Sequence, residues 1–154
     1  MKYYYLFFLI VLFGLSVSCD DEIHCDLPTD SFLKAGFYTI ENSELEIFVL
    51  NNLSVAGIGQ EDSLLYNGEN DIQVILLPLS QISDSCGFLF DIDNTIDTIY
   101  FYYKRQLHLV SPECGFTTYF DVLNYDFTNN IIDSISVVLP KITTNTKMNV
   151  KIFF

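Results

Sequence analysis

The chain has 154 residues, of which 50% are hydrophobic and 16% are aromatic. This composition excludes an intrinsically disordered chain and indicates one folded domain with a single core. Seven Lys and Arg residues oppose twenty Asp and Glu residues, and the resulting net charge of −13 disfavours nucleic acids and anionic lipid headgroups as partners.

Residues 1–18 predict a secretory signal peptide. Lys2 supplies the positive start, residues 6–15 form an apolar stretch, and the small residues Ser16 and Ser18 precede the expected cleavage point. The stretch is too short to span a bilayer, which takes about 20 apolar residues. The segment resembles a bacterial lipoprotein signal, in which Cys19 becomes the first mature residue and is acylated, although Ser16 stands where that signal usually has Leu. An uncleaved membrane anchor and ordinary signal cleavage are the alternatives.

Three acidic residues, Asp20, Asp21 and Glu22, follow the expected lipidation site directly. They resemble the acidic sorting signals that send Bacteroidota lipoproteins to the outer face of the outer membrane. A solvated tether is the plainer interpretation. We therefore expect residues 19–30 to form an acidic tether on a protein anchored to the outer membrane, on either its periplasmic or its exposed side, and residues 31–154 to form the folded domain.

The folded part has a hydrophobic period of two, which predicts strands rather than helices. Residues 44–49 and 148–154 alternate between apolar and polar side chains, whereas residues 72–77 and 99–103 are apolar on both faces, as in strands buried inside a sheet or facing a dimer partner. Further strands are expected at residues 37–41, 86–92, 106–111, 116–127 and 131–139. About eight or nine short strands without an amphipathic helix predict an antiparallel β-sandwich, with a β-barrel as the alternative.

Turn-forming residues separate the expected strands. They are Gly57 and Gly59, Asn67 with Gly68, Asp93 with Asn94, Ser111 with Pro112, and Asn129 with Asn130.

Three cysteines remain for the folded domain once Cys19 is assigned to lipid, so one thiol is left over in an oxidising compartment. Cys86 is in phase with Phe88 on an apolar strand face, where a small buried thiol is common. Cys25 and Cys114 lie in loop-like sequence, which favours a disulfide between them. The competing pairing joins Cys86 to Cys114.

The acidic stretch at residues 91–97 begins like a calcium-binding loop, with oxygen ligands at alternate positions. However, Ile96 and Tyr102 stand where an EF-hand needs Gly and Glu. An acidic turn between two strands is the preferred interpretation.

Zinc and serine-hydrolase chemistry have equally little support. His24, Cys25 and His108 lack the paired spacing of a zinc site, and disulfide formation competes for the cysteines. Ser111 has no Gly-x-Ser-x-Gly sequence around it, and His108 is in strand-like sequence typical of an exposed or packed histidine. We expect no catalytic residue, metal site or cofactor.

Three short segments resemble the Asp-Ser/Thr-aliphatic acceptor for O-glycosylation in exported Bacteroidota proteins. The acceptor residues are Ser63, Thr98 and Ser134. Ser63 is the most accessible of them because it lies in an apparent loop, whereas the other two border strands.

Several of these motifs together carry a family resemblance. They are the early Cys25 in an acidic stretch, Leu77-Pro78-Leu79, Tyr102 or Tyr103, Val110-Ser111, and Cys114-Gly115-Phe116. The chain resembles a family of small Bacteroidota lipoproteins catalogued only as a domain of unknown function. The resemblance implies the pairing of Cys25 with Cys114 and implies that Cys86 is an additional cysteine outside the family's pattern. It implies no activity.

Two classes of function follow from the sequence. The preferred one is a non-enzymatic envelope lipoprotein, held to the membrane by lipid on Cys19, whose β-sandwich binds another envelope protein or a glycan. The alternative is a hydrolase or accessory enzyme with a site built from residues distant in sequence. Two converging carboxylates in a deep pocket, or a histidine near Ser111, would favour the enzyme, and an exposed apolar patch would favour the binding module.

Overall fold

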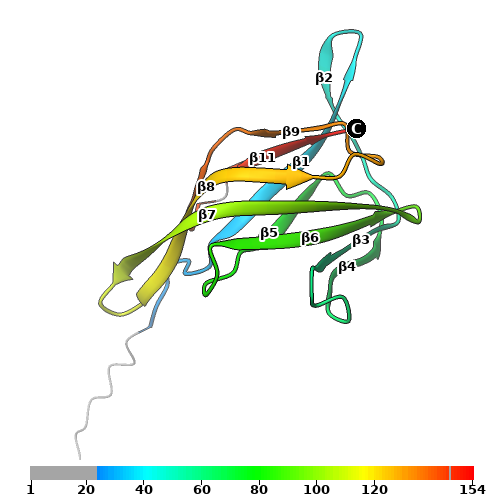
Figure 1. Ribbon diagram of the computed structural model, residues 1–154. Helices are drawn as coiled ribbons and strands as arrows, with labels where there is room; N and C mark the ends of the chain where they lie inside the picture. Colours follow the sequence, from blue (N-terminus) through cyan, green and yellow to red (C-terminus); the bar gives the residue numbers. More distant parts are fainter. Residues whose placement is uncertain (1–23, 146) are drawn as a thin grey trace, which may run out of the picture.

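The alternating segments of the sequence fold into two curled β-sheets, shown in Figure 1. The structure is a computed structural model and describes residues 24–145 and 147–154. One sheet has five strands: β1 (Phe32–Glu41), β2 (Glu44–Ile47), β5 (Val74–Pro78), β9 (Ser134–Val137) and β11 (Val150–Phe153). The other has six: β3 (Leu53–Gly57), β4 (Leu64–Glu69), β6 (Ser85–Ile92), β7 (Thr95–Ser111), β8 (Gly115–Phe127) and β10 (Lys141–Ile142).

Helices do not contribute to the part of the chain that the structure describes. No helix there is long and apolar enough to cross a membrane.

Strand β1 organises the five-stranded sheet. One of its edges pairs with β11 in parallel, and β11 in turn pairs antiparallel with β9. Its other edge is shared by two strands, because β5 pairs with Phe32–Gly36 and β2 with Tyr38–Glu41. The second half of β1 therefore continues past β5 into a hairpin with β2.

The six-stranded sheet runs in the order β10-β8-β7-β6-β3-β4 and is antiparallel throughout. The turn between β6 and β7 consists of two residues, Asp93 and Asn94, with φ angles of 51° and 64°. Two consecutive positive φ angles are the signature of the type I′ turn that joins antiparallel strands, and both residue types tolerate this conformation.

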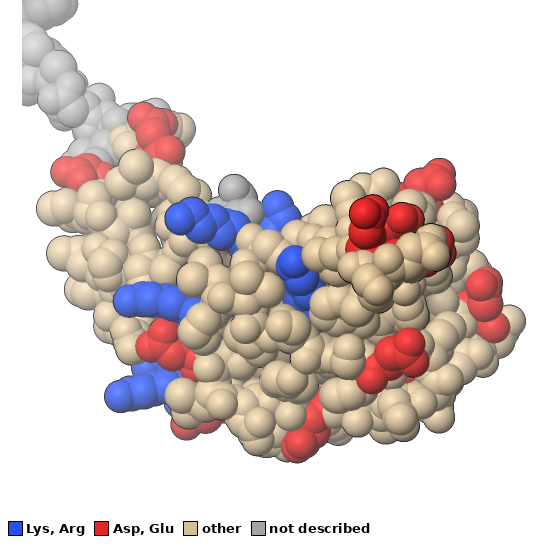
Figure 2. All heavy atoms as spheres, turned by 90° about the horizontal axis from the view of Figure 1, so that it is seen from above, with Lys and Arg blue, Asp and Glu red and all other residues tan. Residues whose placement is uncertain are grey.

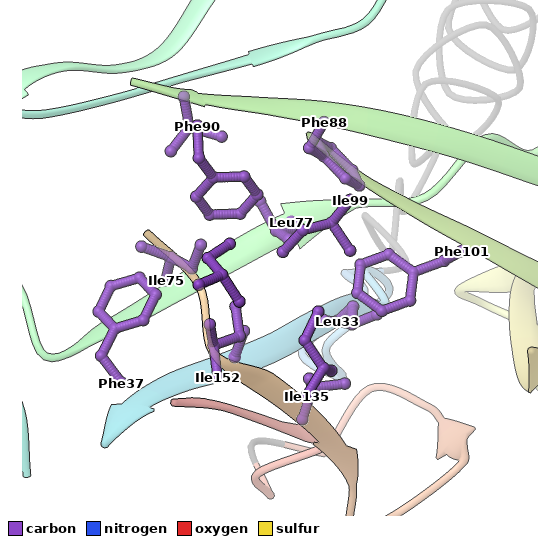
Figure 3. Packing of buried hydrophobic residues seen from close by; sticks show 14 of the residues in the cluster. Leu33, Phe37, Ile75, Leu77, Phe88, Phe90, Ile99, Phe101, Ile135 and Ile152 are labelled. Atoms are coloured by element: carbon purple, nitrogen blue, oxygen red, sulfur yellow. The ribbon is translucent and has the colours of Figure 1, made fainter. Parts of the chain in front are cut away.

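The core lies between the two sheets. In Figure 3, Phe88, Phe90, Ile99 and Phe101 from the six-stranded sheet face Leu33, Phe37, Ile75, Leu77, Ile135 and Ile152 from the five-stranded sheet. All of these side chains are buried. Because each strand places alternate residues on one face, the period of two in the sequence becomes a single continuous core.

A buried asparagine ties the end of the chain to β1. The Lys34 backbone N–H donates a 3.0 Å hydrogen bond to Oδ1 of Asn149, and the Asn149 backbone N–H donates to the Lys34 carbonyl at 2.9 Å. The Asn149 side-chain amide also donates to the Leu139 carbonyl at 3.0 Å. This buried polar side chain is therefore satisfied on both its donor and its acceptor sides.

The expected all-β sandwich is confirmed, with three differences in detail. The described residues form eleven strands rather than eight or nine: β3, β4 and β10 form where no strand was expected, and the strands expected at residues 99–103 and 106–111 are one strand, β7. The pair β1 and β11 is parallel, so the five-stranded sheet is mixed. The apolar segment at residues 72–77 does not lie inside a sheet, because β5 pairs with β1 alone and leaves Val74 and Leu76 exposed.

Candidate functional site

A disulfide joins Cys25 to Cys114, as the sequence favoured over a bridge from Cys86. Cys114 lies in the turn between β7 and β8, where its backbone N–H donates to Oγ of Ser111 at 3.0 Å and Gly115 follows with φ of 71°. Residues before β1 run along this hairpin, because the Thr117 hydroxyl donates a hydrogen bond to the Thr29 carbonyl. The chain therefore enters the described domain at the tip of the β7–β8 hairpin.

The expected lipidation and sorting residues precede this point. Cys19, Asp20, Asp21 and Glu22, together with the signal peptide, lie outside the described residues. Their roles stay predictions.

The acidic stretch at residues 91–97 is a turn between strands, as expected, and its carboxylates do not converge. Asp97 faces the core opposite Phe90 and is fully buried. Its carboxylate accepts four hydrogen bonds from the segment after β8: from the Thr128 hydroxyl at 2.6 Å and from the backbone N–H groups of Asn130, Ile131 and Ile132 at 2.8–2.9 Å. These hydrogen bonds fix residues 128–132, in the connection between β8 and β9, against β7.

The pKa of Asp97 reflects two opposing effects. Burial acts to raise the pKa because it disfavours the charged form, and the four donated hydrogen bonds act to lower it. The hydrogen bonds prevail, so the pKa lies below the ordinary value of an aspartic acid. Asp97 is therefore a charged residue that serves the structure, by accepting hydrogen bonds from the β8–β9 connection.

The free thiol, Cys86, lines a pocket of about 430 Å³ beside Ser80 and Phe88. Burial raises the pKa of the thiol, and a hydrogen bond with the Tyr103 hydroxyl only partly offsets this effect. Burial also raises the pKa of Tyr103, whose hydroxyl oxygen accepts from the Ser80 N–H at 2.9 Å. Because a thiolate is the nucleophilic form, this environment holds Cys86 in its unreactive state.

A larger pocket of about 680 Å³ lies along β7, and it contains one carboxylate, Asp84. Arg105 Nε donates to Asp84 Oδ1 at 2.7 Å, and Arg105 Nη1 donates to the Gln81 carbonyl at 2.7 Å. Both charges are therefore engaged with each other. Within the described residues, no cluster of three His, Cys, Asp or Glu side chains is placed to hold a metal ion.

The histidine and serine considered for hydrolysis have other partners. The His108 ring stacks on Tyr119 with ring centroids 4.3 Å apart. Ser111 accepts the Cys114 N–H and so holds the turn of the hairpin. His108 therefore packs against a tyrosine ring and Ser111 stabilises a turn, and both contacts are of a structural kind.

The three candidate glycosylation residues differ in access. Ser63 is exposed in the loop between β3 and β4, and Ser134 is exposed at the start of β9. Thr98 is only half-buried, in β7, and its backbone N–H donates to the Thr128 hydroxyl. Modification of these residues stays a prediction.

The strongest candidate for a binding surface is one face of the β1–β2 hairpin, which the sequence did not single out. Tyr38 pairs with Ile47 and Ile40 with Leu45, so these four side chains share one face, which we call the hairpin face. Ile40, Leu45 and Ile47 are each at least half exposed. Tyr38 sits beside Phe153, with ring centroids 6.1 Å apart, and Lys151 Nζ lies 4.8 Å from the Tyr38 ring.

The opposite face of the same hairpin is acidic. Glu41 pairs with Glu44, and Thr39 pairs with Glu46, so three carboxylates lie behind the apolar side chains. The turn is again of two residues with positive φ angles, 51° at Asn42 and 68° at Ser43. The period of two at residues 44–49 was the signal for this surface. It was interpreted as a strand with one wet face, whereas all four residues of β2 are exposed.

Charge is unevenly distributed over the molecule. Figure 2 shows basic side chains gathered over the middle and one side of the face seen from above, while acidic side chains dominate its other side. The basic residues of the described chain are Lys34, Lys104, Arg105, Lys141, Lys147 and Lys151. None of them falls within residues 39–47, which carry the three glutamates, and Lys151 is the one that contacts Tyr38 of the hairpin face.

A protein-family model described as a family of unknown function, DUF6452, matches residues 52–154. The match includes β3 to β11 and contains the Leu-Pro-Leu, Val-Ser and Cys-Gly-Phe motifs, whereas Cys25 and the β1–β2 hairpin precede it. No curated protein and no solved structure matches the chain.

Proposed function

The chain belongs to DUF6452, a family of unknown function, and from the features described above we propose that it is an envelope lipoprotein that binds another envelope protein through the hairpin face. Lipid on Cys19 anchors it to the bacterial outer membrane. The acidic residues Asp20, Asp21 and Glu22 act in its sorting. The β-sandwich is a non-enzymatic binding module.

Two features support the location. The first 19 residues have the order of a lipoprotein signal: a positive residue, an apolar stretch, small residues and a cysteine. The disulfide between Cys25 and Cys114 fits an oxidising compartment such as the cell envelope, since structural disulfides are rare in the cytosol.

The observation that carries the binding role is the hairpin face itself. Among the described residues, strand β2 pairs only with β1 and no other element covers Ile40, Leu45 and Ile47, so three large aliphatic side chains project from a two-stranded hairpin. Figure 1 places this hairpin at the far end of the domain from the β7–β8 turn that is bonded to Cys25. A domain tethered at one end thus presents an apolar surface at the other.

The chemistry of the surface favours a protein partner over a glycan. Ile40, Leu45 and Ile47 supply aliphatic area, whereas carbohydrate recognition depends on polar groups placed to pair with sugar hydroxyls. The glutamates behind the hairpin complement basic side chains at the rim of a partner. The partner is therefore a protein with an apolar patch bordered by Lys or Arg.

The binding role is tested by crosslinking in intact envelopes followed by purification of the tagged full chain. We expect a partner that is recovered with the wild type and depleted about tenfold or more with the Ile40→Ser, Leu45→Ser, Ile47→Ser triple variant, because a loss of about 1.4 kcal/mol in binding weakens it tenfold. Leu123→Ser is the control, since Leu123 is exposed on β8. Equal recovery with the triple variant would contradict the proposal.

The anchoring role is tested by mass spectrometry of the mature N-terminus. The expected product begins at Cys19 and carries acyl chains on sulfur and nitrogen. An unmodified Cys19 would contradict the lipoprotein assignment. Protease treatment of intact cells then distinguishes the two faces of the outer membrane, because a surface-exposed domain is digested and a periplasmic one is protected.

A further inference from the structure

The end of the β7–β8 hairpin has a second exposed apolar face. Strand β6 pairs with β7 only from Thr95 to Tyr102, and β10 pairs with β8 only at Phe120 and Asp121. Beyond these points the two long strands pair with each other alone, from Gln106 to Ser111 and from Gly115 to Tyr119. Figure 1 shows this part of the hairpin extending past the neighbouring strands.

The apolar residues of this extension share one face. Leu109 pairs directly with Phe116, and Leu107, two residues earlier on β7, lies on the same side. We call these three residues the tip face. Leu107 is 73% exposed and Phe116 is 63% exposed. The face is the continuation of the core-facing side of the strands, which carries the buried Tyr103 and Phe120 where the opposite sheet covers it.

The covalent structure sets how far this tip can lie from the anchor. Cys114, at the turn of the hairpin, is bonded to Cys25, and Cys25 follows Cys19 by six residues. Six residues span at most about 20 Å when fully extended. The disulfide adds 4.9 Å between the Cα atoms of Cys25 and Cys114. A lipid on Cys19 therefore keeps the hairpin tip within about 25 Å of the membrane surface, whatever path the intervening residues take.

We propose that the tip face is a second membrane contact, in which Leu107, Leu109 and Phe116 enter the interfacial region of the bilayer that holds the lipid on Cys19. This inference rests on the proposed lipid anchor. Large apolar side chains at the end of a hairpin bury their surface there without requiring a spanning segment. The nearby Glu113, Asp26 and Asp30 are exposed and stay among headgroups and water, which limits the contact to the interface.

The chain contains no tryptophan, so a single substitution introduces a unique fluorescent probe. Phe116→Trp reports on the tip face, and Ile47→Trp, on the hairpin face at the other end, is the matched control because the two positions are 63% and 60% exposed. Leu107→Trp gives an independent second probe. Each variant is purified as the lipidated full mature chain and reconstituted into phosphatidylcholine vesicles, with and without brominated lipid.

We expect the tip probes to shift their emission to shorter wavelength on vesicle binding and to be quenched by brominated lipid, while the Ile47→Trp probe keeps its aqueous emission. If the protein floats with the vesicles and no probe is quenched, the tip contact is wrong and the anchor stands. If Cys19 is unmodified and the protein does not float, both are wrong. A blue-shifted tip probe without bromine quenching would indicate a second copy on the tip face and overturn the membrane contact.

Discussion

Asp97 shows how a charged residue is used inside an otherwise apolar core. Its carboxylate is fully buried, and it accepts hydrogen bonds from one hydroxyl and three backbone N–H groups. These donors belong to residues 128–132, which would otherwise present unpaired N–H groups at the edge of the core. The residue thus contributes to stability through the loop that it holds.

Replacing Asp97 with Asn tests this role. We expect Asp97→Asn to lower the free energy of unfolding by about 3 kcal/mol, because the new amide group directs its own N–H groups at backbone donors. Urea denaturation monitored by circular dichroism measures the change. Asp93→Asn in the exposed β6–β7 turn is the control and should change stability by less than about 0.5 kcal/mol; similar losses in both variants would contradict the assignment.

The same residue predicts a pH dependence. The pKa of Asp97 is lowered in the folded state, so its contribution to stability is complete above the unfolded value of about 3.9 and is lost as the pH falls below that value through the folded pKa. We expect the wild type to lose more stability than Asp97→Asn as the pH decreases below about 4. Parallel stability curves for the two proteins over this range would show that Asp97 does not supply the dependence.

At the scale of the strands and turns, Ser43 occupies a conformation that its side chain disfavours. Its φ angle is 68°, in the second central position of the β1–β2 turn. Glycine is preferred at this position of a type I′ turn because it has no Cβ to clash with the following carbonyl. The turn keeps its geometry through the strands on either side of it.

We expect Ser43→Gly to stabilise the domain by about 0.5 kcal/mol, the relief of left-handed strain being partly offset by the greater freedom of the unfolded chain. The midpoint of thermal unfolding measures this gain. Ser63→Gly, at an exposed loop position whose own φ angle is not positive, serves as the reference and should bring no gain. A destabilised Ser43→Gly variant would mean that the hydroxyl has a role in the turn.

Much of the fold followed from local sequence pattern because the strands have one face in the core. The alternation around Phe88 and Phe90 and the pair Asp93 and Asn94 predicted β6 and its turn correctly. By contrast, β3 and β4 were missed, since their ladder contains register shifts and β4 is mostly exposed, which leaves little periodicity to detect. Local alternation also says nothing about strand neighbours, so the edge position of β5 and the parallel pair of β1 with β11 were not predictable.

The candidate surfaces were harder to predict than the strands. Leu45 and Ile47 have the same alternation as core residues, and only the pairing of β2 with β1 alone leaves them exposed. The disulfide was accessible to sequence reasoning because Cys86 was in phase with an apolar strand face while Cys25 and Cys114 were not. Exposure depends on which elements cover a face, and this is a property of the tertiary arrangement.

On the scale of the whole molecule, the disulfide closes a long loop. Cys25 and Cys114 are 89 residues apart, and in the chain-entropy model a bridge of this span stabilises the fold by about 4–5 kcal/mol. We expect the Cys25→Ser, Cys114→Ser variant to unfold at a clearly lower denaturant concentration, with a loss of about 2–5 kcal/mol. Guanidinium titration without reductant makes the measurement.

Cys86, the free cysteine among the described residues, gives the matched comparison for this variant. Cys86→Ala removes a sulfur from the side of a pocket without opening a covalent link, so we expect a loss of about 1 kcal/mol. Adding a reductant should destabilise the wild type and Cys86→Ala alike, because both keep the bridge, and should leave the double variant unchanged. Equal unfolding midpoints for the wild type and the double variant would show that the bridge contributes nothing.

The parallel pairing of β1 with β11 determines when folding can finish. Ala35 pairs with Val150, so the central ladder of the five-stranded sheet joins segments that are synthesised about 115 residues apart. Contacts of such sequence separation form slowly and cannot form until both segments exist. A partly synthesised chain therefore lacks the strand that lies between β1 and β9, so the five-stranded sheet cannot be completed until residue 153 has emerged. In the export that residues 1–18 predict, the chain crosses the membrane in extended form, and this late closure delays completion of the fold until synthesis is nearly finished.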